Sequence, residues 1–286
     1  MNWIIGLGWS EFYLNWFNFV HTIKTLASLF RQIFRKISFS SWKIAFLCGG
    51  LASMGLHRKG LRSFFITALN KSGKGADIEM RFKLCGRKSI FLMREGNLAD
   101  YLIGGELVWG AYSPPKKKPT FIVDGGANIG MFSVLARAYF PDVPIVCYEP
   151  DKANLRQLER NLSVNGISAE VVPKALWSRE TTLFYRAGES YTGHVDENPP
   201  GEEIECAVPR VQDGCWLKLD IEGAEYEVLP QILASGVRPG FISMEIHSNR
   251  EKGEKLVRLL ENSGYQLEQS YDPMPDCINV EAEFRS

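Results

Sequence analysis

The chain has no net charge, because its 33 lysines and arginines are balanced by 33 aspartates and glutamates. Nothing in this overall balance therefore points to nucleic acid as a partner. The sequence also contains no internal repeat and no long low-complexity tract. What it does contain is 286 residues with 45% hydrophobic content, enough for a proper core. This length suits one large domain, or one domain with an extension.

Paired cysteines are also missing. The six cysteines form no C-x-x-C pair and show no metal-ligand spacing, and several lie in apolar runs. We therefore predict reduced, buried thiols in a cytosolic compartment, and no metal site. The positions are Cys48, Cys85, Cys147, Cys206, Cys215 and Cys277.

No run is long enough to cross a membrane. The least charged stretch, Ile44 to Leu56, has 13 residues, short of the roughly 20 that a span needs. The first twenty residues contain Glu11 and three asparagines, with no basic region at the start. A secretory signal is therefore not expected.

The neutral total conceals a basic N-terminal segment. Residues 1–62 hold eight lysines or arginines and one acid, a charge of +7 that leaves −7 for the remainder. The segment is rich in aromatic residues, and apolar residues from Phe19 to Ile37 recur at helical spacing. A basic, aromatic, amphipathic helix suits a membrane surface. The alternative is a helical cap that buries its aromatics on the rest of the chain or in a homodimer, and both interpretations stay open.

The most informative stretch runs from Phe121 to Gly130 (FIVDGGANIG). An apolar strand ends on Asp124, a loop of small residues follows, and Met131 to Tyr139 is expected to form a helix. Glycines let a backbone approach a ligand closely, and the free N–H groups of a helix start favour a carboxylate or phosphate. This order predicts a cofactor site; a tight turn without a ligand is the alternative.

The acid decides which cofactor the loop favours. Dinucleotide loops read G-x-G-x-x-G, with their acid about 20 residues further on. Here Asp124 ends the first strand itself, where it would repel a pyrophosphate and attract an ammonium group. A NAD-dependent dehydrogenase is therefore disfavoured. S-adenosylmethionine carries an amino group and a sulfonium, and the loop resembles motif I of the Rossmann-like methyltransferases, with Asn128 in place of the middle glycine.

A second strand, Pro144 to Tyr148, ends on Glu149, 25 residues after Asp124. A carboxylate there can accept hydrogen bonds from both ribose hydroxyls of the cofactor. The next helix is expected over Asp151 to Leu162, with Asp151 as its N-cap. A third strand, Ala169 to Val172, has no acid after it, so backbone groups near Ala175 would have to bind the adenine.

A third signal is the run from Trp216 to Leu229 (WLKLDIEGAEYEVL). Lys218 and Asp220 interrupt its apolar strand, and unpaired charges are seldom buried, so both are expected to face a ligand at the carboxyl edge of the sheet. Glu222 and Glu225 are expected to open the following helix, where acids complement the helix dipole.

The fifth strand, Gly240 to Ile246, carries Glu245 and is followed by His247. These two residues lie two apart on a strand and therefore face the same side. Either could take the proton of an attacking hydroxyl, which is usually worth about 10²–10⁴-fold in rate. A purely structural histidine remains the alternative.

Together, VDGGANIG, CYEPD and LKLDIEGAEYEVL resemble the FkbM family of S-adenosylmethionine-dependent methyltransferases. The resemblance covers residues 78–285, including a helix near 98–112. Val208 to Cys215 is too short for the helix that precedes the third motif in the family, so one wall of the substrate crevice is expected to be missing or supplied differently. The resemblance places Asp220 near the methyl group. The expected cofactor-binding residues are Asp124, Gly126, Ala127, Asn128, Gly130, Glu149, Pro150, Ala175 and Asp220.

We therefore expect an α/β, Rossmann-like class I methyltransferase fold, a seven-stranded mostly parallel sheet with helices on both faces. The expected divisions are a helical extension (1–77), a pre-core segment (78–119) and the S-adenosylmethionine-binding domain (120–286). The last strands, Tyr265 to Ser270 and Cys277 to Phe284, should form an antiparallel hairpin at one edge.

The expected activity is O-methylation of a hydroxyl on a sugar, glycolipid or secondary metabolite. The alternative is a non-catalytic, membrane-associated binding protein on the same fold. The expected location is cytoplasmic, with residues 1–62 at a membrane surface in one interpretation. The expected catalytic residues, with roles unassigned, are Lys218, Asp220, Glu222, Glu245 and His247.

Overall fold

The computed structural model describes residues 38–52, 59–73, 75–110, 112–186, 193–247, 250–271 and 277–285. The chain forms two compact units, which are described one at a time. The first comprises Met1–Lys83 and Arg94–Ala111, and the second comprises Leu84–Met93 and Tyr112–Ser286. The domain boundaries expected from the sequence stay a prediction.

The second unit is built on a seven-stranded sheet with the order β13-β14-β12-β11-β4-β5-β6. Four neighbouring pairs, β4–β5, β5–β6, β4–β11 and β11–β12, are parallel. β14 runs antiparallel to both β12 and β13, so the expected C-terminal hairpin is confirmed. The strands are β4 (Ile122–Gly125), β5 (Ile145–Tyr148), β6 (Glu170–Val172), β11 (Trp216–Leu219), β12 (Phe241–His247), β13 (Tyr265–Tyr271) and β14 (Cys277–Phe284).

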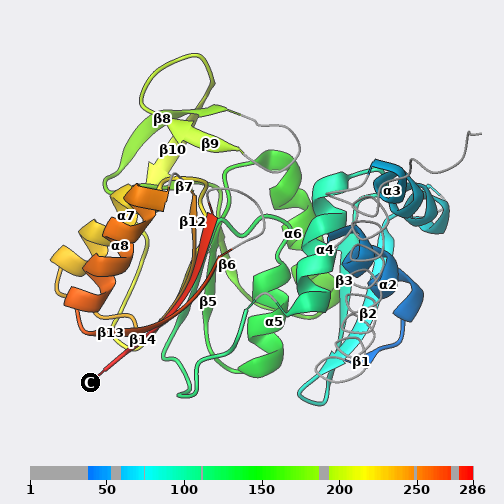
Figure 1. Ribbon diagram of the computed structural model, residues 1–286, viewed down its shortest axis with the longest axis horizontal. Helices are drawn as coiled ribbons and strands as arrows, with labels where there is room; N and C mark the ends of the chain where they lie inside the picture. The colour runs from blue at the N-terminus through cyan, green and yellow to red at the C-terminus, as the bar shows by residue number, and fades with distance from the viewer. Residues whose placement is uncertain are drawn as a thin grey trace, which may run out of the picture. The chain divides into compact units, whose positions relative to one another are not determined.

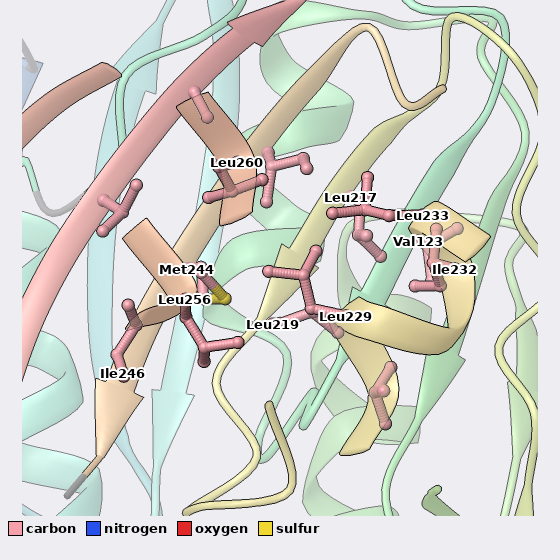
Figure 2. Packing of buried hydrophobic residues seen from close by; sticks show 14 of the residues in the cluster. Val123, Leu217, Leu219, Leu229, Ile232, Leu233, Met244, Ile246, Leu256 and Leu260 are labelled. Carbon is pink, nitrogen blue, oxygen red and sulfur yellow. The ribbon is translucent and has the colours of Figure 1, made fainter. Parts of the chain in front are cut away.

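Helices cover both faces of this sheet (Figure 1). On one face, α7 and α8 pack leucines and isoleucines against apolar side chains of β4, β11 and β12 (Figure 2). On the other face, Phe132 of α5 stacks edge-on against the fully buried Trp216 of β11, with ring centroids 4.7 Å apart. The helices are α5 (Met131–Tyr139), α6 (Lys152–Val164), α7 (Glu225–Ala234) and α8 (Arg250–Asn262).

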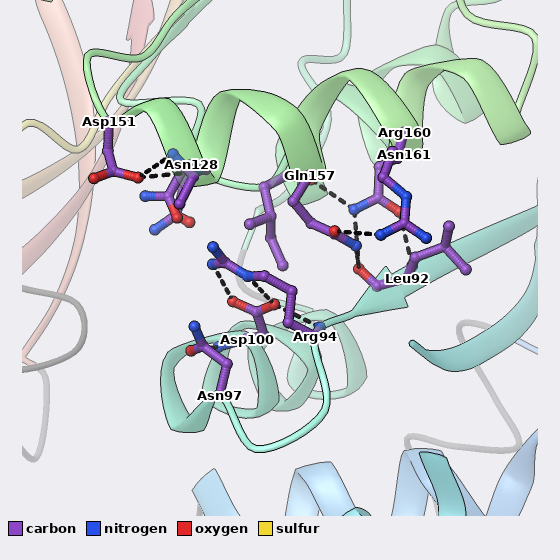
Figure 3. Close-up of polar contacts among 12 residues, drawn as sticks. Leu92, Arg94, Asn97, Asp100, Asn128, Asp151, Gln157, Arg160 and Asn161 are labelled. Carbon is purple, nitrogen blue, oxygen red and sulfur yellow. Dashed lines mark hydrogen bonds and ion pairs between the residues drawn. The ribbon is translucent and has the colours of Figure 1, made fainter. Parts of the chain in front are cut away.

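Helix α6 is held to β3 (Arg87–Met93) by side-chain amides. Asn161 accepts from the N–H of Leu92 at 2.7 Å and donates to its carbonyl at 3.0 Å, so the amide pairs with the strand as a neighbouring strand would (Figure 3). The same amide nitrogen donates to the carbonyl of Ile129 at 2.8 Å. Since Asn161 is fully buried, these bonds fix the glycine loop that contains Ile129.

A second, four-stranded sheet lies between β6 and β11 in the chain, and the sequence analysis missed it. Its order is β7-β10-β8-β9, with β7 and β10 parallel and the other pairs antiparallel. Its last strand ends at Ala207, directly before the short Val208–Cys215 segment at which a missing wall was expected. The strands are β7 (Ala175–Leu176), β8 (Thr181–Arg186), β9 (His194–Asp196) and β10 (Glu202–Ala207).

The first unit is mainly helical, with β1 paired antiparallel to β2. Asp100, fully buried in α4, binds the guanidinium of Arg94 through both oxygens, at 2.9 and 2.6 Å. The helix expected over Phe19 to Ile37 lies outside the described residues. The elements are β1 (Ser38–Phe39), α2 (Trp42–Gly50), α3 (Lys59–Gly73), β2 (Ile78–Leu84) and α4 (Leu98–Trp109).

Two further expectations concern the whole chain. All six cysteines are free, and five are buried, as expected; Cys85 is exposed, in the turn after β2. Across the described residues, every helix is too short or too polar to span a bilayer.

Candidate active site

The sheet order reverses between β4 and β11. In open α/β sheets, ligands bind beyond the carboxyl ends of the strands at such a switch point. Asp124 of β4 lies opposite Lys218 of β11 in the parallel register. Two residues that the sequence analysis singled out are thus adjacent at this point.

Asp124 is fully buried. Its Oδ2 accepts a 2.7 Å hydrogen bond from Ser133 Oγ of α5, a contact the sequence did not suggest. Its Oδ1 lies 3.6 Å from Lys218 Nζ and has no hydrogen-bond partner among the described residues. Burial raises the pKa of Asp124, and Lys218 and Ser133 oppose that shift. The carboxylate therefore depends on the lysine for its charge.

Lys218 was expected to face a ligand, and here the structure differs. The residue is 3% exposed, and its ammonium donates to the carbonyl of Gly126 at 2.6 Å. The same Nζ lies 3.5 Å from Asp220 Oδ2. Lys218 thus joins the loop to two carboxylates, which makes it a positioning residue.

The loop glycines are required by the chain itself. Gly126 has φ +72°, and a Cβ there would overlap the carbonyl oxygen of Asp220. Gly130 has φ +89°, and its Cβ would lie 2.7 Å from Leu158 Cδ1. The N–H groups of Gly126 and Ala127 both donate to Tyr148 O, at 3.0 and 2.9 Å. The sequence analysis explained these glycines by a ligand, whereas close packing of the loop is sufficient.

Asn128 is the non-glycine residue of the loop that adopts a left-handed backbone, with φ 48°. Asparagine tolerates this conformation better than most residues. Its buried side-chain Oδ1 has no hydrogen-bond partner within the described part of the chain. With Asp124 Oδ1, it is the second buried acceptor in this region without a donor.

Glu149, directly after β5, is 5% exposed. Its Oε2 accepts from the N–H of Asn128 at 2.8 Å, and its Oε1 accepts from the N–H of Asp151 at 2.9 Å. Burial raises the pKa of Glu149 to about 7, although these two backbone bonds act in the opposite direction. Pro150 separates Glu149 from Asp151, whose Oδ1 caps α6 as predicted, accepting from two N–H groups at 2.8 Å.

The second sheet contributes residues to this side of the site. Ala175, the residue expected near the adenine, is buried in β7. Tyr185 of β8 was not anticipated; burial first, and then the charges of Glu149 and Asp151, raise its pKa.

A second group of charges surrounds His247 at the end of β12. Its Nε2 lies 3.9 Å from Asp220 Oδ1, 3.6 Å from Glu222 Oε2 and 3.6 Å from Glu245 Oε1. Burial opposes the charged imidazolium, but hydrogen bonds with Cys277 and Glu225 and the charge of Asp220 raise the pKa of His247 overall. The predicted residues Asp220, Glu222, Glu245 and His247 are thus brought together.

Glu225 opens α7 as expected, whereas Glu222 lies before the helix. Glu222 precedes α7 and has a left-handed backbone, with φ 54°. Glu225 is fully buried, and its two oxygens accept from the N–H groups of Ile221 and Gly223, at 2.9 and 2.8 Å. Its Oε1 also lies 3.4 Å from His247 Nδ1. Glu225 therefore holds the loop and orients the histidine.

Strand order, switch-point acids and the glycine loop define a Rossmann-like class I methyltransferase fold. A family model described as the methyltransferase FkbM domain matches residues 124–267, half of the chain. The chain belongs to the FkbM methyltransferase family, and the prediction of S-adenosylmethionine as cofactor is confirmed at the level of the family.

Two fungal proteins are similar to this chain. Methyltransferase 1 of Beauveria bassiana (strain ARSEF 2860) is 27% identical over 147 residues, 40% of this chain and 59% of that protein. Methyltransferase sdnD of Sordaria araneosa is 44% identical over 45 residues, 16% of this chain and 17% of that protein. The chain therefore spans less than two thirds of either relative.

Among solved structures, a methyltransferase FkbM from Methylobacillus flagellatus KT is 13% identical, with a TM-score of 0.40, covering 79% of this chain and 60% of that one. Fibrillarin from Aeropyrum pernix with bound S-adenosyl-L-methionine is 14% identical, with a TM-score of 0.41, covering 71% and 93%.

The residues present fit S-adenosylmethionine. Asp124 Oδ1 and Asn128 Oδ1 are buried acceptors without donors among the described residues, and the cofactor carries an ammonium group and hydroxyls that donate. Glu149 retains a second lone pair on each oxygen for a ribose diol. When bound, this cofactor supplies an electrophilic methyl group on a sulfonium.

Proposed function

We propose that the protein is an S-adenosylmethionine-dependent methyltransferase that methylates a hydroxyl group. Glu149 carries this proposal, because its carboxylate is buried, fixed by two backbone N–H groups and placed directly after β5, beside the glycine loop. A buried carboxylate with a raised pKa needs a partner, and a ribose diol supplies two donors. Family membership supports the same conclusion.

The roles follow from the contacts. Glu149 holds the ribose, and Asp124 with Asn128 holds the amino-acid end of the cofactor, near Ala127 and Pro150. The loop is kept in place by Lys218 and by Gly126 and Gly130, and backbone groups at Ala175 face the adenine. The residues around His247 face the acceptor.

When bound, S-adenosylmethionine would supply the methyl group and its sulfur would keep the electron pair of the broken carbon–sulfur bond, while the residues around His247 would hold the acceptor oxygen. The hydroxyl proton passes to a carboxylate of the His247 group, for which Glu245 is well placed. Such a base contributes about 10²–10⁴-fold. Positioning of the two reactants supplies a further large share of the rate.

Calorimetry with S-adenosylhomocysteine tests the cofactor half of the proposal. We expect saturable binding to the full chain, and its loss in Glu149→Ala and Asp124→Ala. Glu203→Ala is the matched control, since Glu203 is an exposed residue of β10. Absence of binding to the wild-type chain at millimolar ligand would contradict the proposal.

The acceptor class is proposed as a hydroxyl on a sugar, glycolipid or secondary metabolite. A labelled methyl donor, incubated with metabolite and glycolipid extracts, should label one class of product. Alkali-stable label in an ether would support O-methylation, and label on nitrogen or carbon would exclude it.

We also propose that residues 1–62 contact a membrane surface. The charge of this segment supports it, as do the exposed side chains of Trp42 and, just beyond it, Phe64, which are 49% and 60% exposed. Flotation of the full chain with anionic vesicles should carry the protein, and neutral vesicles should not. A dimer in sedimentation without flotation would favour the cap or dimer interpretation instead.

A further inference from the structure

The environment of His247 is unusual for a histidine that acts alone. Three carboxylate oxygens lie 3.6–3.9 Å from its Nε2, and they come from two segments: Asp220 and Glu222 follow β11, and Glu245 lies in β12. One imidazole nitrogen can donate one hydrogen bond. Three acceptors therefore compete for one proton, and negative charge is in excess.

The other ring nitrogen has a dedicated partner. His247 Nδ1 lies 3.4 Å from Oε1 of Glu225, which is fully buried and held by two backbone N–H groups. A carboxylate that accepts from Nδ1–H fixes the ring, so that a cation that displaces the Nε2 proton would meet an outward lone pair, as in carboxylate–histidine–metal arrangements. The outward nitrogen is Nε2, which faces the three carboxylates.

The spacing of these atoms suits a shared cation. Ligands about 2.1 Å from one metal ion lie roughly 3.0–4.2 Å apart, depending on the coordination angle. Asp220, Glu222 and His247 each offer one atom within 4.8 Å of the others. Their side chains are 22–28% exposed, which leaves room for water or an acceptor at the remaining coordination positions.

A second combination, Glu245 with His247 and Cys277, is also within reach. Cys277 Sγ, however, donates to Glu245 Oε1 at 2.9 Å and is also hydrogen-bonded to His247, so the thiol is already engaged within the cluster. The oxygen and nitrogen donors of Asp220, Glu222 and His247 are therefore the better set. Imidazole with carboxylates selects a transition metal over Mg²⁺ or Ca²⁺.

We propose that Asp220, Glu222 and His247 bind a divalent transition-metal cation, for which Mn²⁺ is the probe, at the carboxyl ends of β11 and β12. Binding itself does not depend on the proposed methyl transfer. The role of the cation does: bound there, it would orient an acceptor with two neighbouring oxygens, and Glu245 would remain to take the proton. An acceptor diol or hydroxy-carbonyl group would suit this arrangement.

The sequence analysis predicted no metal site, for an identifiable reason. The ligands lie at 220, 222 and 247, and their spacing matches no compact metal motif. Parallel pairing of β11 with β12 brings them together. The proposed ligands are therefore brought together by strand pairing and not by their spacing in the sequence.

The test is Mn²⁺ binding to the full chain after treatment with a chelator and dialysis. Loss of the electron paramagnetic resonance signal of free Mn²⁺, with calorimetry in parallel, should give one ion per chain. Glu222→Gln and His247→Gln should each weaken binding at least tenfold. His194→Gln, an exposed histidine of β9, is the matched control and should bind as the wild type does.

Two results would overturn the proposal: no Mn²⁺ uptake by the wild-type chain, or equal uptake by Glu222→Gln and His247→Gln. Circular dichroism shows whether each variant is folded. If His247→Gln does not fold, Glu222→Gln alone provides the test. Binding of S-adenosylhomocysteine is measured on the same samples. Cofactor binding without Mn²⁺ removes the metal site alone, whereas Mn²⁺ binding without cofactor removes the proposed activity alone.

Discussion

The carboxyl ends of β4 and β5 differ from those of β11 and β12 in how their acids are satisfied. At β4 and β5, Asp124 and Glu149 are buried, and the chain supplies a lysine, a serine and backbone N–H groups as partners. At β11 and β12, Asp220, Glu222 and Glu245 are partly exposed and crowd around one histidine. The acids of the first side are held by several donors of the chain, although Asp124 Oδ1 lacks a donor among the described residues; those of the second side share one histidine.

This difference separates two kinds of charged residue in one sheet. An acid held by the chain's own donors contributes to stability, so its removal should lower the free energy of unfolding. An acid that lies among several other acids is expected to serve a ligand, so its removal should lower the affinity for that ligand. Substitutions and changes of pH can test this division.

Lys218→Met should be the most damaging change. It leaves the fully buried Asp124 without its counter-charge, and breaking a buried pair on one side costs about 3–5 kcal/mol. Urea denaturation at neutral pH measures the loss, and Lys218→Met combined with Asp124→Asn should recover part of it.

Lys152→Met is the control, because Lys152 pairs with Glu202 in a fully exposed contact. Its unfolding midpoint should equal that of the wild type. A Lys218→Met variant as stable as the wild type would show that the side of β4 is not held by this charge pair.

The stability of the protein should fall as the pH rises from about 4.5 to 7. In this window the unfolded chain has released the Glu149 proton, while the folded chain, with its pKa raised to about 7, still holds it. The resulting loss is about 3 kcal/mol for this residue. Unfolding free energies between pH 4.5 and 8 measure it, and Glu149→Gln should flatten that part of the curve.

Cofactor affinity should depend on the ionisation of Glu149 in the opposite direction to stability. Ribose hydroxyls donate to the ionised carboxylate, so affinity for S-adenosylhomocysteine should rise with pH through about 7. Calorimetry in buffers of different ionisation enthalpy should show proton release near pH 7. Binding without proton release would place Glu149 outside the ribose contact.

Gly126→Ala should cost more than Gly166→Ala. Both glycines have positive φ, +72° and +60°, so both variants bear the left-handed penalty of about 1–2 kcal/mol. At Gly126 the new Cβ also meets Asp220 O, whereas Gly166 has open space, and overpacking adds about 1–3 kcal/mol. Equal unfolding free energies for the two variants would contradict the close contact of loop and strand.

Asp220→Asn should change stability least, by within about 1 kcal/mol, because its carboxylate is 28% exposed and Lys218 remains paired with Asp124. Thermal unfolding measures this. A large destabilisation would show that the β11–β12 side is also held together by its charges.

Much of the fold was accessible from the sequence. The helix over Met131–Tyr139 and the strand over Cys277–Phe284 fall where apolar spacing placed them, because each has a strong period and clear ends. The cap at Asp151 followed from local chemistry. The four-stranded sheet was missed, because β7 and β9 have two and three residues, too few to show a period.

The sequence predicted which residues form the site better than it predicted their contacts. Asp124, Glu149, Asp220 and His247 lie at strand ends, as the motifs indicated. That Lys218 would turn toward Gly126 O depends on the neighbouring strand, which no local pattern reports. The contact of Ser133 with Asp124 and that of Glu225 with His247 were not predicted for the same reason.

The position of Lys218 has a practical consequence. The residue is 3% exposed and its ammonium is bonded to the glycine loop through Gly126 O, so an amine-reactive reagent is expected to reach it only when the loop moves. The rate of modification of Lys218 would therefore measure the rate of loop opening. Mass spectrometry can follow it, with the exposed Lys152 as the reference. A bound methyl donor should slow the modification of Lys218. Occupancy of the cofactor site could then be measured without a labelled ligand.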